Sequence, residues 1–444
     1  MGLVGPEMPL IEGHTACLNL WDPKITNTAV ENITWQEYRP VSQINSTSTI
    51  EFSVPNSGSQ YFDLRKTRLM MKLKVVNKDG SALEATDQVW PINLIMNTMF
   101  SQVDLLLQQK QVTRLTAPGY ALKSYVDTLL HHQASAKNGF LQAQLWHVDT
   151  PNAFDNLEVA PQGDQAVMGV SNSGAVKRYA MTKLSAPIQL EGNLNVDFMQ
   201  QRRYLLNGVP LLFRLWQSPE SFRLMTAKEG AEYRIEIIDI VLKMAAIDVL
   251  PEVLVGHSEA LKRAPATYNF AQSDIKTFAV SKGQYSFTAD NLFQGSVPSL
   301  AYVFLVPSEA FNGSFKRNPF NMVHADASYI SFTVDNRDVP SSALTPDYDK
   351  GMWTDCFISM LTASRNYDVN VGNEIQMSHY PQGFTIYGFD IDSMDSLNYL
   401  PMPKKGNCRI NIQFSKALTE SMNLIIYSKY PSCVMINAAR GVTV

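Results

Sequence analysis

The sequence predicts an all-β protein that consists of two tandem eight-stranded jelly-roll β-sandwiches with short helical insertions. Apolar residues recur at every second position in many short runs, and few segments have the spacing of a helix. One pattern of strands, turns and a helix also occurs twice along the 444 residues. Two units of about 200 residues suit two such sandwiches, and an immunoglobulin-like sandwich stays open as the alternative.

Residues 1–46 are expected to form an extended N-terminal arm rather than a barrel strand or a long helix. The segment contains four prolines and shows no sustained periodicity. It also contains Leu18, Trp21, Ile33 and Trp35, which is too much apolar surface for a solvated tail. We therefore expect the arm to dock beneath its own sandwiches or onto a neighbouring oligomer.

The first jelly roll is assigned to residues 47–250. Within it, Leu69, Met71 and Leu73 alternate with lysines, as in a strand that buries one face. A helical insertion is predicted near residues 121–132, where apolar residues form one helical stripe. The stripe comprises Leu122, Tyr125, Val126, Leu129 and Leu130.

The second half of the chain begins with a predicted linker helix at residues 251–264, which starts at a proline and could bridge two domains. The second jelly roll is assigned to residues 265–444. A further inserted helix is predicted near residues 352–362, in the same relative place as the helix of the first unit.

The internal repeat is recognised by comparing the two halves. Residues 91–95 (PINLI) match residues 319–323 (PFNMV), an offset of 228 residues. The same offset pairs Pro118 with Pro346, Tyr125 with Trp353 and Asp127 with Asp355. Later pairs are residues 194–198 with 410–414 and residues 211–215 with 424–428. The repeat predicts that the two inserted helices occupy equivalent places, with Tyr125 and Trp353 as matching core positions.

The amino-acid composition indicates which classes of function the chain can have. Charged residues make up 18% of the chain, against roughly 25% in an average soluble protein. We therefore expect much of the surface to contact other protein. The chain has 37 Lys and Arg against 41 Asp and Glu, and it lacks the basic excess that condensing nucleic acid requires.

Catalytic and metal-binding motifs were sought among the polar residues. The histidines are His14, His131, His132, His147, His257, His324 and His379, and none belongs to an HxH or HExxH motif. His131 and His132 are expected to interact with the dipole at a helix C-terminus. Asp390, Asp392 and Asp395 lack the glycine and distal glutamate of a calcium loop, so they predict an Asx-rich turn. Residues 169–174 (GVSNSG) space the serine wrongly for a nucleophile elbow. The sequence therefore predicts no catalytic, cofactor-binding or metal-binding residues and no enzymatic activity.

Targeting signals are weak. The cysteines, Cys17, Cys356, Cys408 and Cys433, lie far apart, which favours buried free thiols and a reducing compartment. No stretch approaches the roughly 18–20 uninterrupted apolar residues of a membrane-spanning helix, so no membrane span is expected.

Several long strings occur together in a characteristic order. They are TIEFSV (49–54), YFDLRKTRL (61–69), PINLIMNTMFSQVDL (91–105), RYLLNGVPL (203–211), SFTADNLFQG (286–295) and AFNGSFKRNPFNMVH (310–324). Together they resemble the hexon-like major capsid proteins of Maverick/Polinton elements and adintoviruses. The resemblance implies a double jelly-roll protein that forms trimers of pseudo-hexagonal outline on an icosahedral shell, with no catalytic residues or cofactors.

The same resemblance implies a virion location, with assembly in the nucleus or cytoplasm of the host cell. The expected partners are further copies of the chain, in a homotrimer and in neighbouring capsomers, and penton or minor capsid proteins. The shell would enclose a DNA genome without strong direct binding. A carbohydrate-binding or enzymatic double β-sandwich is the alternative, and it would need a concave cleft with convergent carboxylates or histidines. A domesticated host scaffold protein with the same fold is a third reading.

Overall fold

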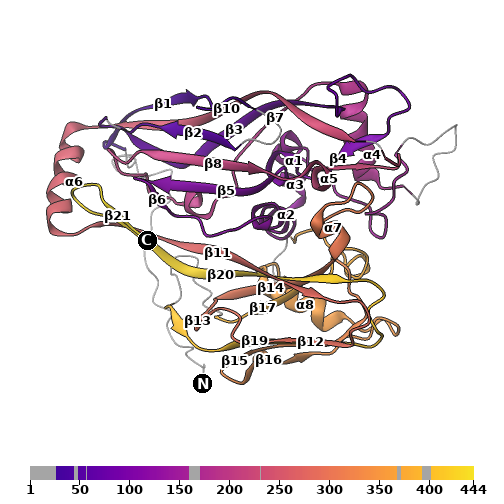
Figure 1. The fold of residues 1–444 in the computed structure, drawn as a ribbon. Coiled ribbons are helices and arrows are strands. Elements are labelled where there is room, and N and C mark those ends of the chain that lie inside the picture. Colours follow the sequence, from indigo (N-terminus) through magenta and orange to yellow (C-terminus); the bar gives the residue numbers. More distant parts are fainter. Residues whose placement is uncertain are drawn as a thin grey trace, which may run out of the picture.

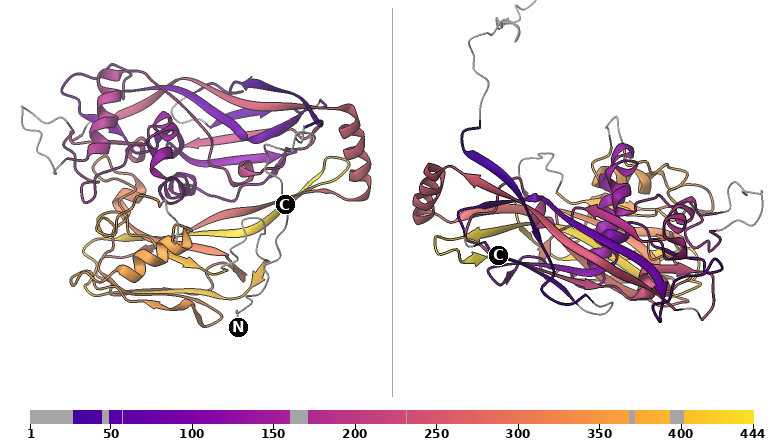
Figure 2. Two further views of the ribbon diagram at one scale, coloured as in Figure 1. Left: turned by 180° about the vertical axis from the view of Figure 1, so that it is seen from behind. Right: turned by 90° about the horizontal axis from the view of Figure 1, so that it is seen from above.

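The computed structural model describes residues 27–44, 49–56, 58–159, 171–230, 232–367, 372–392 and 402–444. These residues form two β-sandwiches that lie one above the other in Figure 1. Four sheets are stacked in layers, and helix α2 (Gly119–His131) lies between the second and the third layer (Figures 1 and 2). The predicted all-β fold with two sandwiches is confirmed.

The first sandwich contains two four-stranded antiparallel sheets. The outer sheet has the order β1 (Val30–Tyr38), β10 (Tyr233–Val249), β3 (Tyr61–Asn77), β7 (Ile188–Gly192). The inner sheet has the order β2 (Ile50–Val54), β8 (Leu211–Gln217), β5 (Phe100–Leu107), β6 (Lys110–Gln111). Numbered along the chain, the eight strands pair as 1-8-3-6 and 2-7-4-5, which is the arrangement of a jelly roll.

The second sandwich repeats this arrangement. Its inner sheet has the order β11 (Ala266–Val280), β20 (Met422–Ile436), β14 (Leu300–Pro307), β17 (Tyr387–Asp390). Its outer sheet has the order β12 (Ser286–Ala289), β19 (Cys408–Phe414), β15 (Ala327–Val334), β16 (Arg337–Leu344). The eight strands again pair as 1-8-3-6 and 2-7-4-5, so the duplication extends to every strand.

Short elements complete the two units. The extra strands are β4 (Val89–Pro91), β9 (Leu224–Thr226), β13 (Ser296–Val297), β18 (Lys404–Lys405) and β21 (Val442–Thr443). Helices in connecting loops are α1 (Ile95–Thr98), α3 (Ala134–Lys137), α4 (Ser173–Thr182), α5 (Glu220–Arg223), α7 (Ser308–Asn312) and α8 (Thr354–Ala363). Helix α6 (Pro251–Arg263) joins the sandwiches at the opposite end from most of these helices (Figure 1).

The alternation seen in the sequence explains how strand β3 packs. Leu69, Met71 and Leu73 are fully buried in the core, whereas Lys72 on the other face is exposed. Because side chains alternate across a strand, a slip of one residue would move the lysines into the core. The register with β10 is therefore strongly specified by burial.

The expectation that residues 1–46 form no barrel strand is wrong for residues 30–38. They form β1, which pairs with β10 and is the first strand of the jelly roll, so the first sandwich begins before residue 47. The sequence did not predict this strand because β1 lies at the edge of its sheet and exposes Ile33 and Trp35 to solvent. Its sequence therefore lacks the alternation of buried apolar and exposed polar residues that identifies a strand. Residues 1–26 lie outside the described residues, and docking of that segment stays a prediction.

The later part of the repeat alignment is also wrong. Residues 211–215 lie in β8, the seventh strand of the first sandwich, whose counterpart is β19 at residues 408–414. Residues 424–428 lie instead in β20, the eighth strand. Strands of a sandwich share one alternating pattern, so short strings match a neighbouring strand as readily as the true counterpart.

The two inserted helices correspond in chain order but not residue by residue. Each follows the fifth strand of its sandwich, β6 or β16. However, α2 packs on β5, whereas α8 packs chiefly on β17. Asp127 is buried near the end of α2, and its predicted counterpart Asp355 is exposed in the first turn of α8. The expected match of these positions is therefore wrong.

Candidate functional site at the junction of the sandwiches

Helix α2 is the element shared by the two sandwiches. Every residue from Gly119 to Leu130 is buried, although the helix carries both Lys123 and Asp127. The helix contacts β5 and α1 of the first sandwich on one side and β11 of the second sandwich on the other. A helix enclosed by two sheets has no solvent face, so its charged residues require partners within the protein.

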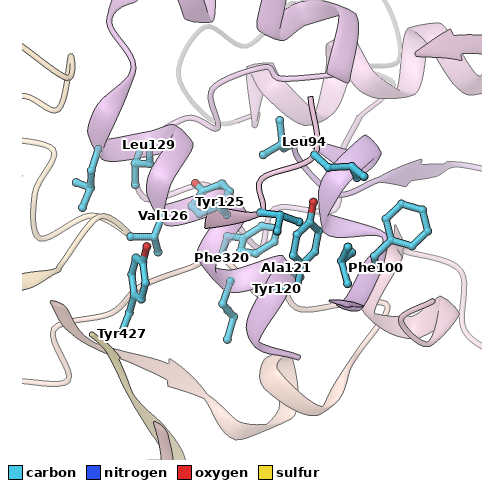
Figure 3. Close-up of a cluster of buried hydrophobic side chains, with 14 of the residues drawn as sticks. Leu94, Phe100, Tyr120, Ala121, Tyr125, Val126, Leu129, Phe320 and Tyr427 are labelled. Atoms are coloured by element: carbon cyan, nitrogen blue, oxygen red, sulfur yellow. The ribbon is translucent and has the colours of Figure 1, made fainter. Parts of the chain in front are cut away.

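An aromatic stack crosses the junction. The ring of Tyr125 on α2 lies parallel to that of Phe320 in the second sandwich, with centroids 4.1 Å apart and an interplanar angle of 4°. Figure 3 shows the two rings side by side, with Tyr120 and Val126 on either side along the helix. Phe222 packs edge-on against Phe320 at 6.2 Å. The stack extends the hydrophobic core of one sandwich into the other.

A cluster of ion pairs surrounds the polar side of α2. The Lys123 ammonium, only 1% exposed, lies 2.8 Å from Asp127 Oδ2 and 3.1 Å from Asp197 Oδ1. It also donates to the side-chain oxygen of Asn195 at 2.9 Å. Its contact with the backbone carbonyl of Asn195 is 3.1 Å long, so the first sandwich surrounds this buried cation with four oxygen atoms and all three of its protons have an acceptor.

The second sandwich completes the same cluster from strand β20. Tyr427 donates its hydroxyl proton to Asp127 Oδ1 at 2.8 Å, and Lys429 Nζ lies 3.1 Å from the same oxygen. Ser273 on β11 donates its backbone N–H to Asp197 at 2.8 Å. Asp127 thus receives hydrogen bonds from both halves of the chain.

The charges of the cluster are fixed at neutral pH. Burial alone would raise the pKa of Asp127, but the ammonium groups of Lys123 and Lys429 hold that pKa well below its usual range. Burial alone would lower the pKa of Lys123, but the carboxylates of Asp127 and Asp197 raise it. Burial and the neighbouring Lys429 lower the pKa of His131 to about 3. None of these groups exchanges a proton near pH 7, so the arrangement suits structural pairing rather than general acid–base chemistry.

The structure separates the histidines and aspartates that the sequence singled out. His131 lies in the last turn of α2 and His132 at its C-cap, where the sequence placed them, and burial lowers the pKa of both. Asp390 ends β17, Asp392 pairs with Lys404 at 2.9 Å, and Asp395 is not among the described residues. Across the described part of the chain, no group of three or more His, Cys, Asp or Glu residues could hold a metal ion.

The GVSNSG string has a structural role where it is described. Asn172 is the N-cap of α4, and its side-chain oxygen accepts from the backbone N–H of Gly174 at 3.1 Å. Its amide donates to Asp149, whose carboxylate also pairs with Arg178 at 2.7 Å. Both members of this ion pair are fully buried, so the cap anchors the loop that carries Trp146 and His147.

Sequence reasoning missed Lys123, Asp197, Tyr427 and Lys429. A signal was present in part: Lys123 and Asp127 lie four residues apart within an otherwise apolar helical run. A charged pair at that spacing in a helix that is apolar on its remaining faces indicates buried partners. The residues from the second sandwich, however, become neighbours of this pair only through the tertiary fold.

The described cysteines are free thiols, and two of the three are buried as the sequence predicts. Cys356 and Cys408 are buried free thiols, and burial raises the pKa of Cys356 to about 12. Cys433 is a half-buried free thiol, and Cys17 falls outside the described residues. Within the described ranges, no helix has the length and apolar character needed to cross a bilayer.

Replacing the carboxylate shared by the two sandwiches is expected to destabilise the protein. Asp127→Leu should lower the free energy of unfolding by about 3–5 kcal/mol, because the buried Lys123 loses its nearest counter-charge. Urea titration measures the loss. Adding Lys123→Met to this variant should recover part of it by removing the stranded ammonium. The control is Asp355→Leu in the first turn of α8, where the carboxylate is exposed, and it should change stability by less than about 1 kcal/mol. Equal losses at Asp127 and Asp355 would contradict the assignment.

Acid is expected to destabilise the protein before the carboxylates titrate. Folded His131 stays neutral down to about pH 3, whereas the unfolded chain takes up a proton below a pKa of about 6.5. Stability therefore falls as the pH decreases from 6.5. The stabilisation that Asp127 provides is lost only at lower pH, below the pKa of about 3.9 that an aspartate has in the unfolded chain. His131→Gln should reduce the difference between urea midpoints at pH 7 and pH 5. Because 33% of the His131 side chain is exposed, solvent screens its charge, and we expect only a shift of the urea midpoint. An unchanged difference would argue against this origin.

Comparisons with known proteins identify proteins with a similar sequence or fold. No protein-family model matches the chain. An uncharacterized protein of Caenorhabditis elegans is 20% identical over 430 residues, which cover 94% of this chain and 98% of that protein. Among solved structures, the Sputnik virophage structure determined by cryo-EM matches with a TM-score of 0.65 and 11% identity, covering 100% of this chain and 94% of the other.

Two further structures have the same architecture. The mavirus major capsid protein has a TM-score of 0.54 and 12% identity, with coverage of 99% of this chain and 96% of the other. The PBCV-1 virus capsid has a TM-score of 0.57 and 9% identity, with coverage of 95% and 99%. At these identities the likeness establishes the fold: the chain is a double jelly roll of the type found in viral major capsid proteins.

Proposed function

We propose that the chain is a hexon-like major capsid protein that assembles as homotrimers of pseudo-hexagonal outline into an icosahedral shell. The observation that carries the proposal is the presence of two sandwiches with one strand order, stacked in the same sense within a single chain. The similarity to capsid proteins over nearly the full length supports it. The proposed role is structural and requires no catalytic group or cofactor.

The stacking within the chain indicates how copies associate. The β2-β8-β5-β6 sheet of the first sandwich faces the β11-β20-β14-β17 sheet of the second across α2. Two different surfaces meet, so the contact is head-to-tail rather than self-complementary. A head-to-tail contact that repeats with a suitable rotation closes a ring. Three chains would then supply six sandwiches, which fill a six-coordinated lattice position.

Closing the ring requires the two outer sheets to meet between chains. In this arrangement the β12-β19-β15-β16 sheet of one chain packs on the β1-β10-β3-β7 sheet of the next. The latter sheet exposes 42% of Ile33 and 47% of Trp35 on its outer face. The guanidinium of Arg68 lies 5.0 Å from the centre of the Trp35 ring. An exposed Trp beside an Arg is typical of the residues that dominate protein–protein interfaces.

The proposed virus group is the Maverick/Polinton and adintovirus type. The strings quoted from the sequence support it. The proposed location is the virion, with assembly in the nucleus or cytoplasm and with penton or minor capsid proteins as further partners. A net charge of −4 suits a shell that encloses DNA without binding it strongly. A neighbouring packaging ATPase or integrase gene would distinguish a viral element from a domesticated host scaffold.

The trimer and its proposed interface are tested together. Light scattering of the purified protein should give the mass of three 49.7 kDa chains, and electron microscopy should show trimers or shells. Trp35→Asp should shift the mass toward one chain, because loss of an interface Trp costs about 2 kcal/mol or more of association energy. The control is Phe140→Asp, at the start of a short 3-10 helix (Phe140–Gln144) that belongs to neither sheet; Phe140 is 60% exposed, and the substitution should leave the trimer intact.

Three results would contradict the proposal. One is a wild-type protein that stays monomeric at all concentrations. Another is a turnover of carbohydrate or another substrate that a single substitution abolishes, which would favour the enzymatic alternative. The third concerns the interface alone: a Trp35→Asp variant that stays as trimeric as Phe140→Asp would show that Trp35 is not part of the trimer interface. Circular dichroism of each variant confirms that it is folded.

A further inference from the structure

A cavity of about 660 Å³ lies beneath helix α6, at the end of the molecule where the chain passes from one sandwich to the other. Val253 and Leu261 of α6 form part of one wall, and Leu206, Val249 and Tyr268 form part of the opposite side. Tyr61 and His257 hold the helix at the cavity through a hydrogen bond of 2.8 Å between the hydroxyl and Nδ1. The volume is in the range of sites that bind an organic ligand or a peptide side-chain cluster.

Helix α6 is poorly covered for a helix with this sequence. Leu261 is the one residue between Pro251 and Arg263 that is buried, while Val253 and Leu254 are half-buried. Short isolated helices are marginal in water, and most of their stability in proteins comes from packing an apolar face. The cavity therefore leaves the inner face of α6 without the apolar contacts that such a helix requires.

We propose that the N-terminal segment, residues 1–26 of the same chain, docks in this cavity. The described part of the chain begins at Asn27, and Ala29 and Val30 already form part of the cavity wall. The backbone N–H of Leu250 donates to the carbonyl of Ala29 at 3.2 Å, which ties this point to the start of α6. The preceding segment therefore enters directly at the cavity.

The length and composition of the segment suit the site. Cys17 lies ten positions before Asn27, and ten residue steps can span up to about 33 Å when extended. The 13-residue helix α6 is about 20 Å long, so the segment can follow all of it. Residues 16–21 read ACLNLW and contain Leu18, Leu20 and Trp21. These side chains would bury apolar surface against a wall that is itself largely apolar.

The charges are complementary as well. Residues 1–26 contain Glu7, Glu12 and Asp22 against a single lysine. The cavity is lined by Arg202 and Arg203, both exposed, and it has no acidic residue among its described lining residues. Carboxylates of the segment would therefore meet guanidinium groups at the site, which favours one orientation of docking. The inference concerns a single chain and does not depend on the proposed capsid function.

Hydrogen–deuterium exchange tests the docking on the full-length protein. We expect backbone amides of residues 16–26 and of α6 to be protected, and Ala260→Glu, which places a charge inside the cavity, to raise exchange of residues 16–26 at least tenfold. The control is Val255→Glu on the same helix, because Val255 is 63% exposed and does not line the cavity. Deleting residues 1–26 should raise exchange of α6 by a similar factor. Unchanged exchange of α6 after the deletion would overturn the proposal, as would equal effects of the two substitutions.

Crosslinking identifies which chain supplies the segment. Cys17 is a natural probe within it, and Ala260→Cys provides a partner inside the cavity. A short bis-maleimide should join the two within one chain, as shown by peptide mass mapping, whereas Val255→Cys should give little product. A crosslink between chains would move the docking to a second copy and contradict docking within the chain. No crosslink at either position, or equal crosslinks at both, would contradict docking in this cavity altogether.

Discussion

The burial of helix α2 between two sheets is the constraint on which the arrangement of the sandwiches depends. The helix brings a lysine and an aspartate into a region without solvent, and each must be neutralised there. Asp197 of the first sandwich pairs with Lys123, and Lys429 of the second pairs with Asp127, which also accepts a hydrogen bond from Tyr427. The first sandwich alone would hold two carboxylates against one ammonium in this cluster, and Lys429 of the second supplies the balancing charge. The relative position of the sandwiches is thus set by charge pairing as well as by the packing of Tyr125 on Phe320.

A buried ion cluster contributes more to fixing the relative position of the two sandwiches than to the stability of their junction. Taking charged groups out of water is costly, and apolar residues of similar size often stabilise a junction equally well. An apolar contact, however, tolerates small displacements, whereas hydrogen bonds of 2.8–3.1 Å to one carboxylate do not. For the capsid subunit proposed above, a fixed angle between the two halves would help each copy to fit a repeating assembly. The cluster around Asp127 suits that purpose.

The architecture of the two sandwiches could be predicted from the sequence, whereas the contacts at their junction could not. Alternation in strands such as β3 and the helical stripe of α2 are local patterns that burial imposes directly, so they could be recognised. Strand β1 could not, because an edge strand with Ile33 and Trp35 facing outward lacks that pattern. The partners of Asp127 could not be recognised either. Tyr427 is 300 residues away in the chain, and only the completed fold makes it a neighbour.

The contrast between the two faces of the first sandwich has a consequence for how the two halves of the chain can differ. Its inner face holds a charge cluster that is covered as soon as the chain folds. Its outer face pairs its charges on the surface, as in Lys74 with Glu236 and Lys243 with Glu191, both at 3.0 Å. Two sandwiches on separate chains would each have to expose such faces to water before meeting. Because both sandwiches belong to one chain, the faces that meet at α2 are never exposed separately, and the two halves need not be interchangeable there.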